Sequence, residues 1–321
     1  MARRVRVFSP ATLSNLGPGF DIFGLALTQP GDSVEGELCD QPGIEIVEIS
    51  GDGGALSLAA GENVTAVAAA HLLKRAAATG AGRHRETGVR LWLQKGIPIA
   101  SGLGGSAASS VAGAFVVNEL LGRPFGPGEI IESALEGEKV AAVTAHGDNI
   151  IPCLIGGIVL IRRLSPLDVV SLPVPRDLHL GVVHPHCQIS TAAARALLDG
   201  RRFPLEAAVA NAGNAAAFVS ALYREDLALL GRSVVDRLVE PVRAPLVPGF
   251  TRVRDAAARN GALACSISGS GPTMFALADS EIRARSAADA MRAAFAEAAG
   301  LESDVFIGQV NDAGTVVVSC E

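Results

Sequence analysis

Hydrophobic and polar positions along the chain follow two patterns, which predict a mixture of strands and helices. Apolar residues that alternate with polar ones, as at Val89, Leu91 and Leu93, are typical of strands with one buried face. Longer runs of small apolar residues predict helices, and Asn63 is placed to cap one of them. We expect strands at 5–8, 44–49, 89–93, 158–162, 178–183, 262–267 and from 273, and helices at 66–78, 106–121, 129–143, from 191, and at 205–223, 251–260 and 281–299.

The order of these elements indicates how the chain is organised. Strands and helices mix without a strict βαβ rhythm, which favours α+β layers over a doubly wound sheet. Three prolines punctuate residues 165–175, a stretch that could carry an interdomain strand or a linker. We therefore expect one domain over 1–165 and a second over 166–321. Asp312-Ala313-Gly314 suits a tight turn and predicts a terminal hairpin.

Composition narrows the class of protein. With 321 residues, 49% of them hydrophobic and 19% charged, the chain can bury a large core and is not disordered. The net charge of −6, without a dense basic cluster, gives no reason to expect nucleic acid. Five cysteines without a C-x-x-C pair fit a reducing compartment. The basic start lacks an apolar run, and residues 150–161 are too short and too broken to span a bilayer. We expect a soluble, cytoplasmic protein that contacts no membrane.

The strongest local signal is the segment SGLGGSAAS at 101–109, between a predicted strand and a predicted helix. Its glycines permit positive φ and close approach of a ligand to the backbone. The free amides at the start of the helix, together with the helix dipole, favour an anion there. Ser106 adds a hydroxyl that could ligate Mg²⁺. The segment predicts a phosphate-binding loop, and the alternative is a glycine-rich turn that binds nothing.

Two familiar nucleotide loops do not fit this segment. A Walker loop needs Gly-Lys followed by Ser or Thr, and none of Lys74, Lys95 and Lys139 follows a glycine. The spacing of Gly102, Gly104 and Ala107 nearly matches a dinucleotide-binding fingerprint. That fingerprint also requires a second strand ending in an acid about twenty residues later. The chain has the end of a helix and the break Gly122-Arg123-Pro124 there instead.

Two further glycine-rich segments complete a larger pattern: PATLSNLGPGFDIFGLAL at 10–27 and SISGSGPTMFAL at 266–277. Together, and in this order, the three segments resemble the signature motifs of the GHMP kinases. AHGDNIIPCLIGG at 145–157, STAAARALL at 190–198 and EPVRAPLVPGF at 240–250 narrow the resemblance to the homoserine kinase family, over residues 5–277. The chain departs from this pattern at Leu13-Ser14, at Gly105, where a loop serine is usual, and at Asp199, where proline is common.

The resemblance implies a fold and a reaction. The expected fold is α+β with two domains, an N-terminal domain like ribosomal protein S5 and a C-terminal ferredoxin-like α/β sandwich. The expected reaction moves the γ-phosphoryl group of ATP to the hydroxyl of L-homoserine, with Mg²⁺, and gives O-phospho-L-homoserine for threonine biosynthesis. The family also implies a homodimer.

The resemblance also implies roles for individual residues. Ser106 and Glu138 would hold Mg²⁺. Asp21, with Asn15 nearby, would meet the ammonium group of the acceptor, and Arg195 and Arg243 would clamp its carboxylate, which the planar guanidinium suits. His146 and Asn149 would lie beside the hydroxyl, with Asp148 adjacent, and we expect no strong general base. The phosphate loop comprises Pro98, Ile99, Ala100, Ser101, Gly102, Leu103, Gly104, Gly105, Ser106, Ala107 and Ala108.

Several of these residues also have ordinary structural interpretations. Asn15 and Asp21 are common turn residues, and Glu138 could be one more solvated acid on a helix. His184-Pro185-His186-Cys187 resembles a metal cluster, but no second ligand pair has matching spacing, so we expect an ordinary loop. The competing functions are a GHMP kinase for mevalonate or shikimate, and a ligand-binding regulator without turnover.

Overall fold

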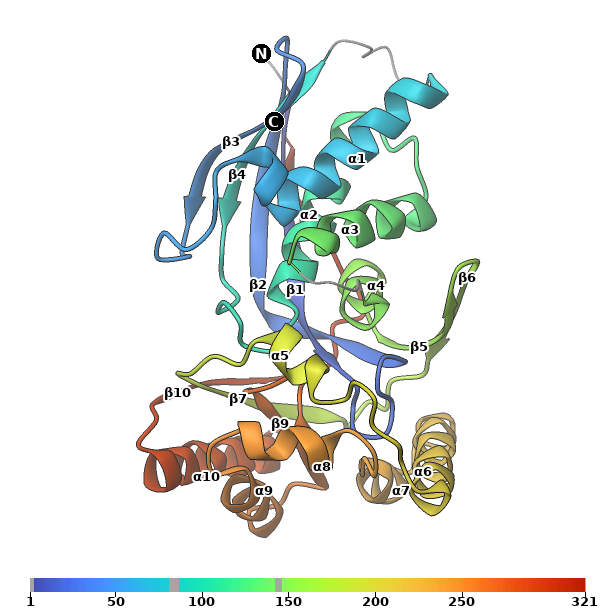
Figure 1. The fold of residues 1–321 in the computed structure, drawn as a ribbon, viewed down its shortest axis with the longest axis vertical. Coiled ribbons are helices and arrows are strands. Elements are labelled where there is room, and N and C mark those ends of the chain that lie inside the picture. The colour runs from blue at the N-terminus through green and yellow to red at the C-terminus, as the bar shows by residue number, and fades with distance from the viewer. Residues whose placement is uncertain (1–2, 81–86, 142–145, 321) are drawn as a thin grey trace.

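The chain folds around two sheets, one above the other in Figure 1. The computed structural model describes residues 3–80, 87–141 and 146–320. The larger sheet has seven strands in the order β11-β1-β2-β4-β3, and the pair β5 and β6 branches from β2. Its strands are β1 (Arg4–Ser14), β2 (Phe23–Cys39), β3 (Gly43–Ser50), β4 (Gly88–Gln94), β5 (Ile158–Leu164), β6 (Leu167–Leu172) and β11 (Val316–Cys320).

Four helices cover one side of the larger sheet: α1 (Val64–Thr79), α2 (Gly105–Leu120), α3 (Pro127–Ala141) and α4 (Gly147–Ile155). Asn63 caps α1, because its side chain accepts a hydrogen bond from the amide of Thr65. Helix α2 is buried on nearly all sides, which explains its small residues. At Gly113 a β-carbon would lie 2.2 Å from the carbonyl oxygen of Thr65, so glycine allows α1 and α2 to pack closely.

The smaller sheet is antiparallel, with strand order β10-β7-β9-β8. Its strands are β7 (His179–Pro185), β8 (Ala264–Ile267), β9 (Met274–Ala278) and β10 (Ser303–Gly308). The helices that follow β7 along the chain are α5 (Thr191–Ala196), α6 (Leu205–Arg224), α7 (Leu227–Ser233), α8 (Glu240–Arg243), α9 (Phe250–Arg259) and α10 (Glu281–Ala299). Of these, α6 contacts β6 of the larger sheet. Helix α10 packs on β7, β9 and β10. Together with the larger sheet, this arrangement confirms the α+β class. None of the helices in the described part of the chain is long and apolar enough to cross a membrane.

The predicted elements are largely present, but several elements were missed, among them the short helices α7 and α8, and one predicted pairing is wrong. Strand β2 was not predicted, although it is the longest strand. Helix α4 was also missed, because Pro152 and the following glycines suggested a break. The terminal hairpin is wrong: Asn311 does hold the turn at 312–314, but β10 pairs with β7 whereas β11 pairs with β1. The predicted end of α3 at 142–143 lies outside the described residues.

Strand pairing bears on the division into domains at residue 165, which stays a prediction. Strands β6 and β11 both come after that position in the chain, yet both pair within the larger sheet. The stretch 165–175 therefore carries a strand that forms a hairpin with β5. The chain ends on the sheet where it began.

Candidate active site

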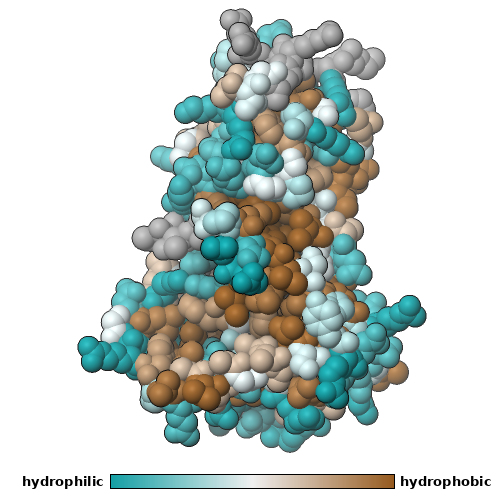
Figure 2. All heavy atoms as spheres, turned by 90° about the vertical axis from the view of Figure 1, so that its right-hand side faces the viewer, coloured by the Kyte–Doolittle hydropathy of each residue, from teal (hydrophilic) through white to brown (hydrophobic). Residues whose placement is uncertain are grey.

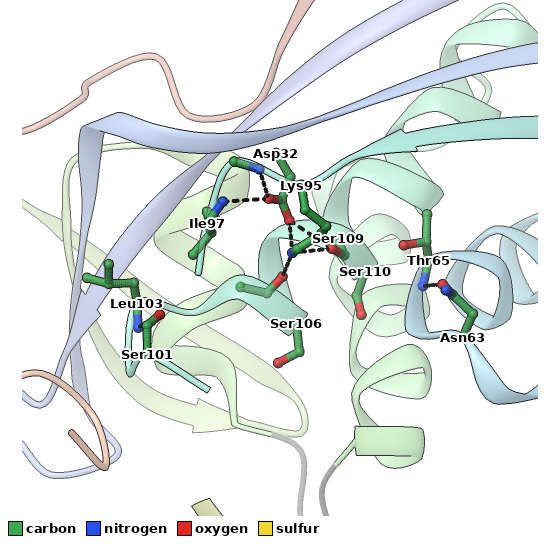
Figure 3. A network of polar contacts seen from close by, with 12 residues as sticks. Asp32, Asn63, Thr65, Lys95, Ile97, Ser101, Leu103, Ser106, Ser109 and Ser110 are labelled. Atoms are coloured by element: carbon green, nitrogen blue, oxygen red, sulfur yellow. Dashed lines mark hydrogen bonds and ion pairs between the residues drawn. The ribbon is translucent and has the colours of Figure 1, made fainter. Parts of the chain in front are cut away.

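The phosphate loop connects β4 to α2 and presents the start of that helix to a cavity. Gly104 precedes the helix with φ of 67°, a left-handed conformation that favours glycine. No described side chain caps this helix, so the amides of its first turn remain available to an anion. Figure 3 shows Ser101, Leu103 and Ser106 along this loop. This geometry suits an anion, which is what the predicted phosphate loop requires.

The three glycine-rich segments meet at this loop. The amide of Thr12 donates to the carbonyl oxygen of Leu103 at 3.0 Å, which joins the first segment to the second. The hydroxyl of Ser268 donates to the carbonyl oxygen of Gly102 at 2.7 Å, which joins the third. The amide of Gly269 reaches the carbonyl oxygen of Ser14 at 3.4 Å. Three segments that are far apart in sequence thus form one wall.

A cavity of about 500 Å³ lies beside the junction of the three segments. Most of the predicted site residues line it: Asn15, Asp21, Pro98, Ile99, Ala100, Ser101, Gly102, Gly104, Gly105, Ser106, Glu138, His146, Asn149, Arg195 and Arg243. The other three loop residues, Leu103, Ala107 and Ala108, bury their side chains in the core instead. The volume of the cavity is in the range of cofactor and substrate pockets.

Ser106 and Glu138 lie together although 32 residues separate them. The Ser106 hydroxyl donates to one carboxylate oxygen of Glu138 at 3.0 Å, and the Ser110 hydroxyl to the other at 3.3 Å. Burial raises the pKa of Glu138 to about 7, although the two hydroxyls and the charge of Lys95 act in the opposite direction. A buried carboxylate beside a hydroxyl, facing a cavity, fits a hard divalent cation.

An internal ion pair lies at the end of the cavity that contains the predicted acceptor-binding residues. Arg195 binds Asp21 through two hydrogen bonds, at 3.0 and 2.7 Å. Arg243 is only 4% exposed and donates to the carbonyl oxygen of Gly269 at 2.9 Å, while its Nε has no described partner. The ring of Phe20 lies about 5 Å from both guanidinium groups and spaces them. Sequence reasoning missed Phe20 and this ion pair. Because Asp21 and Arg195 neutralise each other, the site offers one group of each charge to a ligand that carries both charges.

The remaining predicted residues are held by neighbours. Asn15 donates to Gly269 and accepts from the amide of Asp21, so its side chain shapes the turn that presents Asp21. Asn149 accepts from Thr12 at 2.8 Å and donates to the Ser14 hydroxyl at 3.3 Å. His146 lies 3.7 Å from Asp21, and burial lowers its pKa. Of these side chains, those of Asn15 and Asn149 are engaged with the protein itself.

Asp148 is a second buried carboxyl at this end. It is 3% exposed, lines the cavity, and has its pKa raised to about 7 by burial. The sequence left open whether Asp148 or Asn149 faces the cavity, and the structure brings both there. Sequence reasoning also missed Lys95, although it is one of only three lysines and lies three residues before the phosphate loop.

The raised pKa of Asp148 predicts a pH-dependent stability. The folded protein retains this proton up to about pH 7, whereas the unfolded chain releases it near pH 4, so the unfolded state binds fewer protons between these values. Stability therefore falls as the pH rises through this window, and Glu138 contributes with the same sign. We expect Asp148→Asn to raise Tm at pH 8 more than at pH 5. Melting curves measure this, with the exposed Asp199→Asn as control; an equal shift at both pH values would contradict it.

Replacing Gly104 with valine tests the loop. A β-carbon at this position would lie 2.1 Å from the Thr12 hydroxyl and 2.9 Å from Asn149, so the new side chain would push on the wall and not on the ligand. Positive φ adds strain for a β-branched residue. We expect ATP binding, measured by calorimetry, to be abolished and Tm to fall. Unchanged nucleotide affinity would show that the loop is an ordinary glycine-rich turn that does not bind phosphate.

The side chains of the histidine-rich segment 184–187 contact separate partners. His184 contacts Thr273, His186 pairs with Asp304, and the two rings are 6.3 Å apart between centroids. Among residues 3–80, 87–141 and 146–320, no three His, Cys, Asp or Glu side chains are grouped to hold a metal ion. His184 and Pro185 end strand β7 and are not part of a loop, and only His186 and Cys187 follow it. That this segment holds no metal stays a prediction.

Comparison with known proteins agrees with this geometry. Residues 63–157 match the GHMP kinases N terminal domain and residues 218–297 the GHMP kinases C terminal domain. The homoserine kinase of Chlorobium phaeobacteroides (strain BS1) is 40% identical over 321 residues, covering 98% of this chain and all of the relative.

Solved structures extend the comparison. The crystal structure of homoserine kinase from Cytophaga hutchinsonii superimposes with a TM-score of 0.92 at 42% identity, and the match covers 98% of this chain and 97% of the other. The mevalonate kinase of L. major, solved with R-mevalonate, shares the fold with a TM-score of 0.71 at 17% identity, over 96% and 95% of the two chains. The two-domain fold, the match over nearly the full length and the level of identity show that the chain belongs to the homoserine kinase family of the GHMP kinases.

Proposed function

We propose that the protein transfers the γ-phosphoryl group of ATP to the side-chain hydroxyl of L-homoserine. The observation that carries this proposal is the charge arrangement of the acceptor end, where Asp21 and Arg195 neutralise each other and Arg243 lacks an acidic partner among the described residues. An amino acid has an ammonium group and a carboxylate. It can therefore replace the Asp21–Arg195 pair by two new pairs, its ammonium group with Asp21 and its carboxylate with Arg195. A substrate with a carboxylate alone would leave Asp21 unpaired, which is costly in a half-buried site.

The nucleotide would occupy the other end of the cavity. The phosphate loop offers uncapped amides to the phosphates, and Leu56, Asn63 and Val64 line the cavity beyond it, where a base could pack. Ser106 and Glu138 would hold Mg²⁺, since they supply the hydroxyl and carboxylate oxygens that this ion prefers. A bound Mg²⁺ stabilises the charge that develops on the transferred phosphoryl group.

The side chains of this protein then act mainly by positioning. Arg243 and Arg195 orient the carboxylate of homoserine, Asp21 orients its ammonium group, and its hydroxyl lies beside His146 and Asn149. Asn149 is bound to Thr12 and Ser14 and so can fix geometry, but its side chain is an amide and is not basic enough to remove a proton. The hydroxyl proton leaves to the phosphate or to water.

Release of ADP separates this enzyme from a regulator that only binds its ligands. We expect ADP to form when ATP, Mg²⁺ and L-homoserine are all present, at a rate proportional to protein concentration. Binding of ATP without homoserine-dependent ADP release would show a regulator.

The homodimer and the cytoplasmic location remain predictions. Apolar residues gather on the face shown in Figure 2, and sedimentation would measure the oligomeric state directly.

A further inference from the structure

A buried ion pair lies directly behind the phosphate loop. Asp32, on β2, is fully buried and forms an ion pair with Lys95, which follows β4 and is itself 8% exposed. Figure 3 shows these two residues together with Ile97 and Ser109. The family resemblance assigned no role to either charge, and the proposed mechanism uses neither of them.

The Asp32 carboxylate has all its acceptor positions occupied. One oxygen accepts from the amides of Gly96 and Ile97, each at 3.1 Å. The other accepts from the Ser109 hydroxyl at 2.8 Å and from the Lys95 ammonium group. The carboxylate thus joins the segment before the phosphate loop to the second turn of α2.

The Lys95 ammonium group extends this network to the start of α2. It donates to the carbonyl oxygen of Gly105 at 3.0 Å and to the Ser109 hydroxyl at 2.9 Å, in addition to Asp32. Its three donors are therefore all used. A β-carbon at position 105 would lie 3.2 Å from Ile97 and 3.6 Å from the ammonium nitrogen. The first of these contacts is tight and the second is ordinary, so a side chain at position 105 would press on Ile97.

These bonds hold both ends of the phosphate loop. Ile97 precedes the loop and Gly105 follows its glycine turn, and both are bound to the same charge pair. A buried ion pair rarely adds net stability over apolar residues of similar volume, so a stabilising role alone does not explain its presence. A cation in the first turn of a helix also opposes the helix dipole, and Asp32 offsets it.

We propose that Asp32, acting through Lys95 and Ser109, is a positioning residue that sets the phosphate loop for ATP. The proposal rests on ATP being the phosphoryl donor. The Asp32–Lys95 pair is neutral overall, so it adds no net charge to the phosphate site. It acts by fixing the direction in which the first amides of α2 point. Displacement of a bound group by about 1 Å can cost a hundredfold in rate, so loosening both ends of the loop should affect the nucleotide strongly.

Two variants separate positioning from simple stabilisation. Asp32→Asn keeps an oxygen for the two amides but leaves Lys95 without its counter-charge, so Tm should fall and the KM for ATP should rise by about ten- to a hundredfold. The double variant Asp32→Asn with Lys95→Met removes both charges, so Tm should recover. The KM for ATP should stay raised in the double variant, because nothing holds the Gly105 carbonyl. The KM for homoserine should change by less than about twofold in both, since that end of the cavity is untouched.

The outcomes discriminate clearly. If the pair only stabilises the fold, the double variant regains both Tm and wild-type KM for ATP, and the proposal is overturned. If Lys95 serves by binding the nucleotide directly, freeing it in Asp32→Asn leaves ATP binding unchanged or tighter, which also overturns it. Equilibrium binding of ADP to wild type separates failure of this proposal from failure of the proposed function. If wild type does not bind ADP, the proposed function itself is wrong. Lys74→Met, at an exposed lysine of α1, is the matched control.

Discussion

Glu138→Gln will lower kcat by about a hundredfold or more, with little change in homoserine binding, because charge stabilisation of the transferring phosphoryl group is greatest in the transition state. Glutamine keeps the shape and an oxygen for the Ser106 hydroxyl but removes the negative charge that a divalent cation would meet. Steady-state kinetics at saturating ATP, homoserine and Mg²⁺ measure this effect. Ser106→Ala should act in the same direction with a smaller loss, since it removes a neutral ligand.

Two comparisons sharpen the first prediction. Glu136→Gln alters a partly exposed acid on the same helix that pairs with Lys139, so it should behave as wild type. A rise in Mg²⁺ concentration should restore some activity to Glu138→Gln if the defect is weakened metal binding. Wild-type turnover of Glu138→Gln at saturating Mg²⁺ would show that this carboxylate is a structural helix residue.

Arg243→Leu should reduce kcat/KM for homoserine by roughly 2–4 kcal/mol, about thirty- to a thousandfold. Most of the loss should lie in the KM for homoserine, because the carboxylate is remote from the reacting hydroxyl and is bound alike in ground and transition states. Arg195→Leu should cost as much, and it additionally leaves Asp21 without its partner in the free enzyme. The affinity for ATP should hardly change in either variant.

The shape of the arginine side chain allows a finer test. Lysine at position 243 should rescue only part of the loss, since a point charge does not reproduce the planar fork. Homoserine methyl ester, which lacks the carboxylate charge, should be a poor substrate for wild type and nearly indifferent to both arginine variants. Arg285→Leu, on the surface of α10, is the control. If the arginine variants lose ATP affinity, or discriminate against the ester as wild type does, the carboxylate lies elsewhere.

Local patterns predicted the helices better than the strands. Helix α10 was predicted with its observed bounds, because a long alanine-rich run follows Ser280, whose side chain caps the helix. The strand β2 was missed because its segment begins within a glycine-rich motif and contains Pro30 and Gly31. Strands β10 and β11 were wrongly paired, because adjacency in sequence cannot reveal that each completes a different sheet.

In the site as well, the residues that belong to a motif could be predicted, whereas contacts between residues far apart in sequence could not. The resemblance named Ser106 and Glu138, and the structure brings them within hydrogen-bonding distance. It could not reveal that Arg195 binds Asp21, since 174 residues separate them and their approach depends on how α5 packs near the first motif. The Asp32–Lys95 pair was hidden for a related reason: Asp32 lies on the strand that was missed, so nothing placed it behind the loop.

The most direct test of the central claim compares acceptors under identical conditions. L-homoserine, D-homoserine, mevalonate and shikimate are each supplied with ATP and Mg²⁺, and kcat/KM is taken from ADP release, with the phosphorylated product identified by ³¹P NMR. We predict that L-homoserine exceeds mevalonate and shikimate by at least about a hundredfold, and that the product is O-phospho-L-homoserine, because neither of those two acceptors has an ammonium group to pair with Asp21. Equal or faster phosphorylation of mevalonate or shikimate would contradict the account.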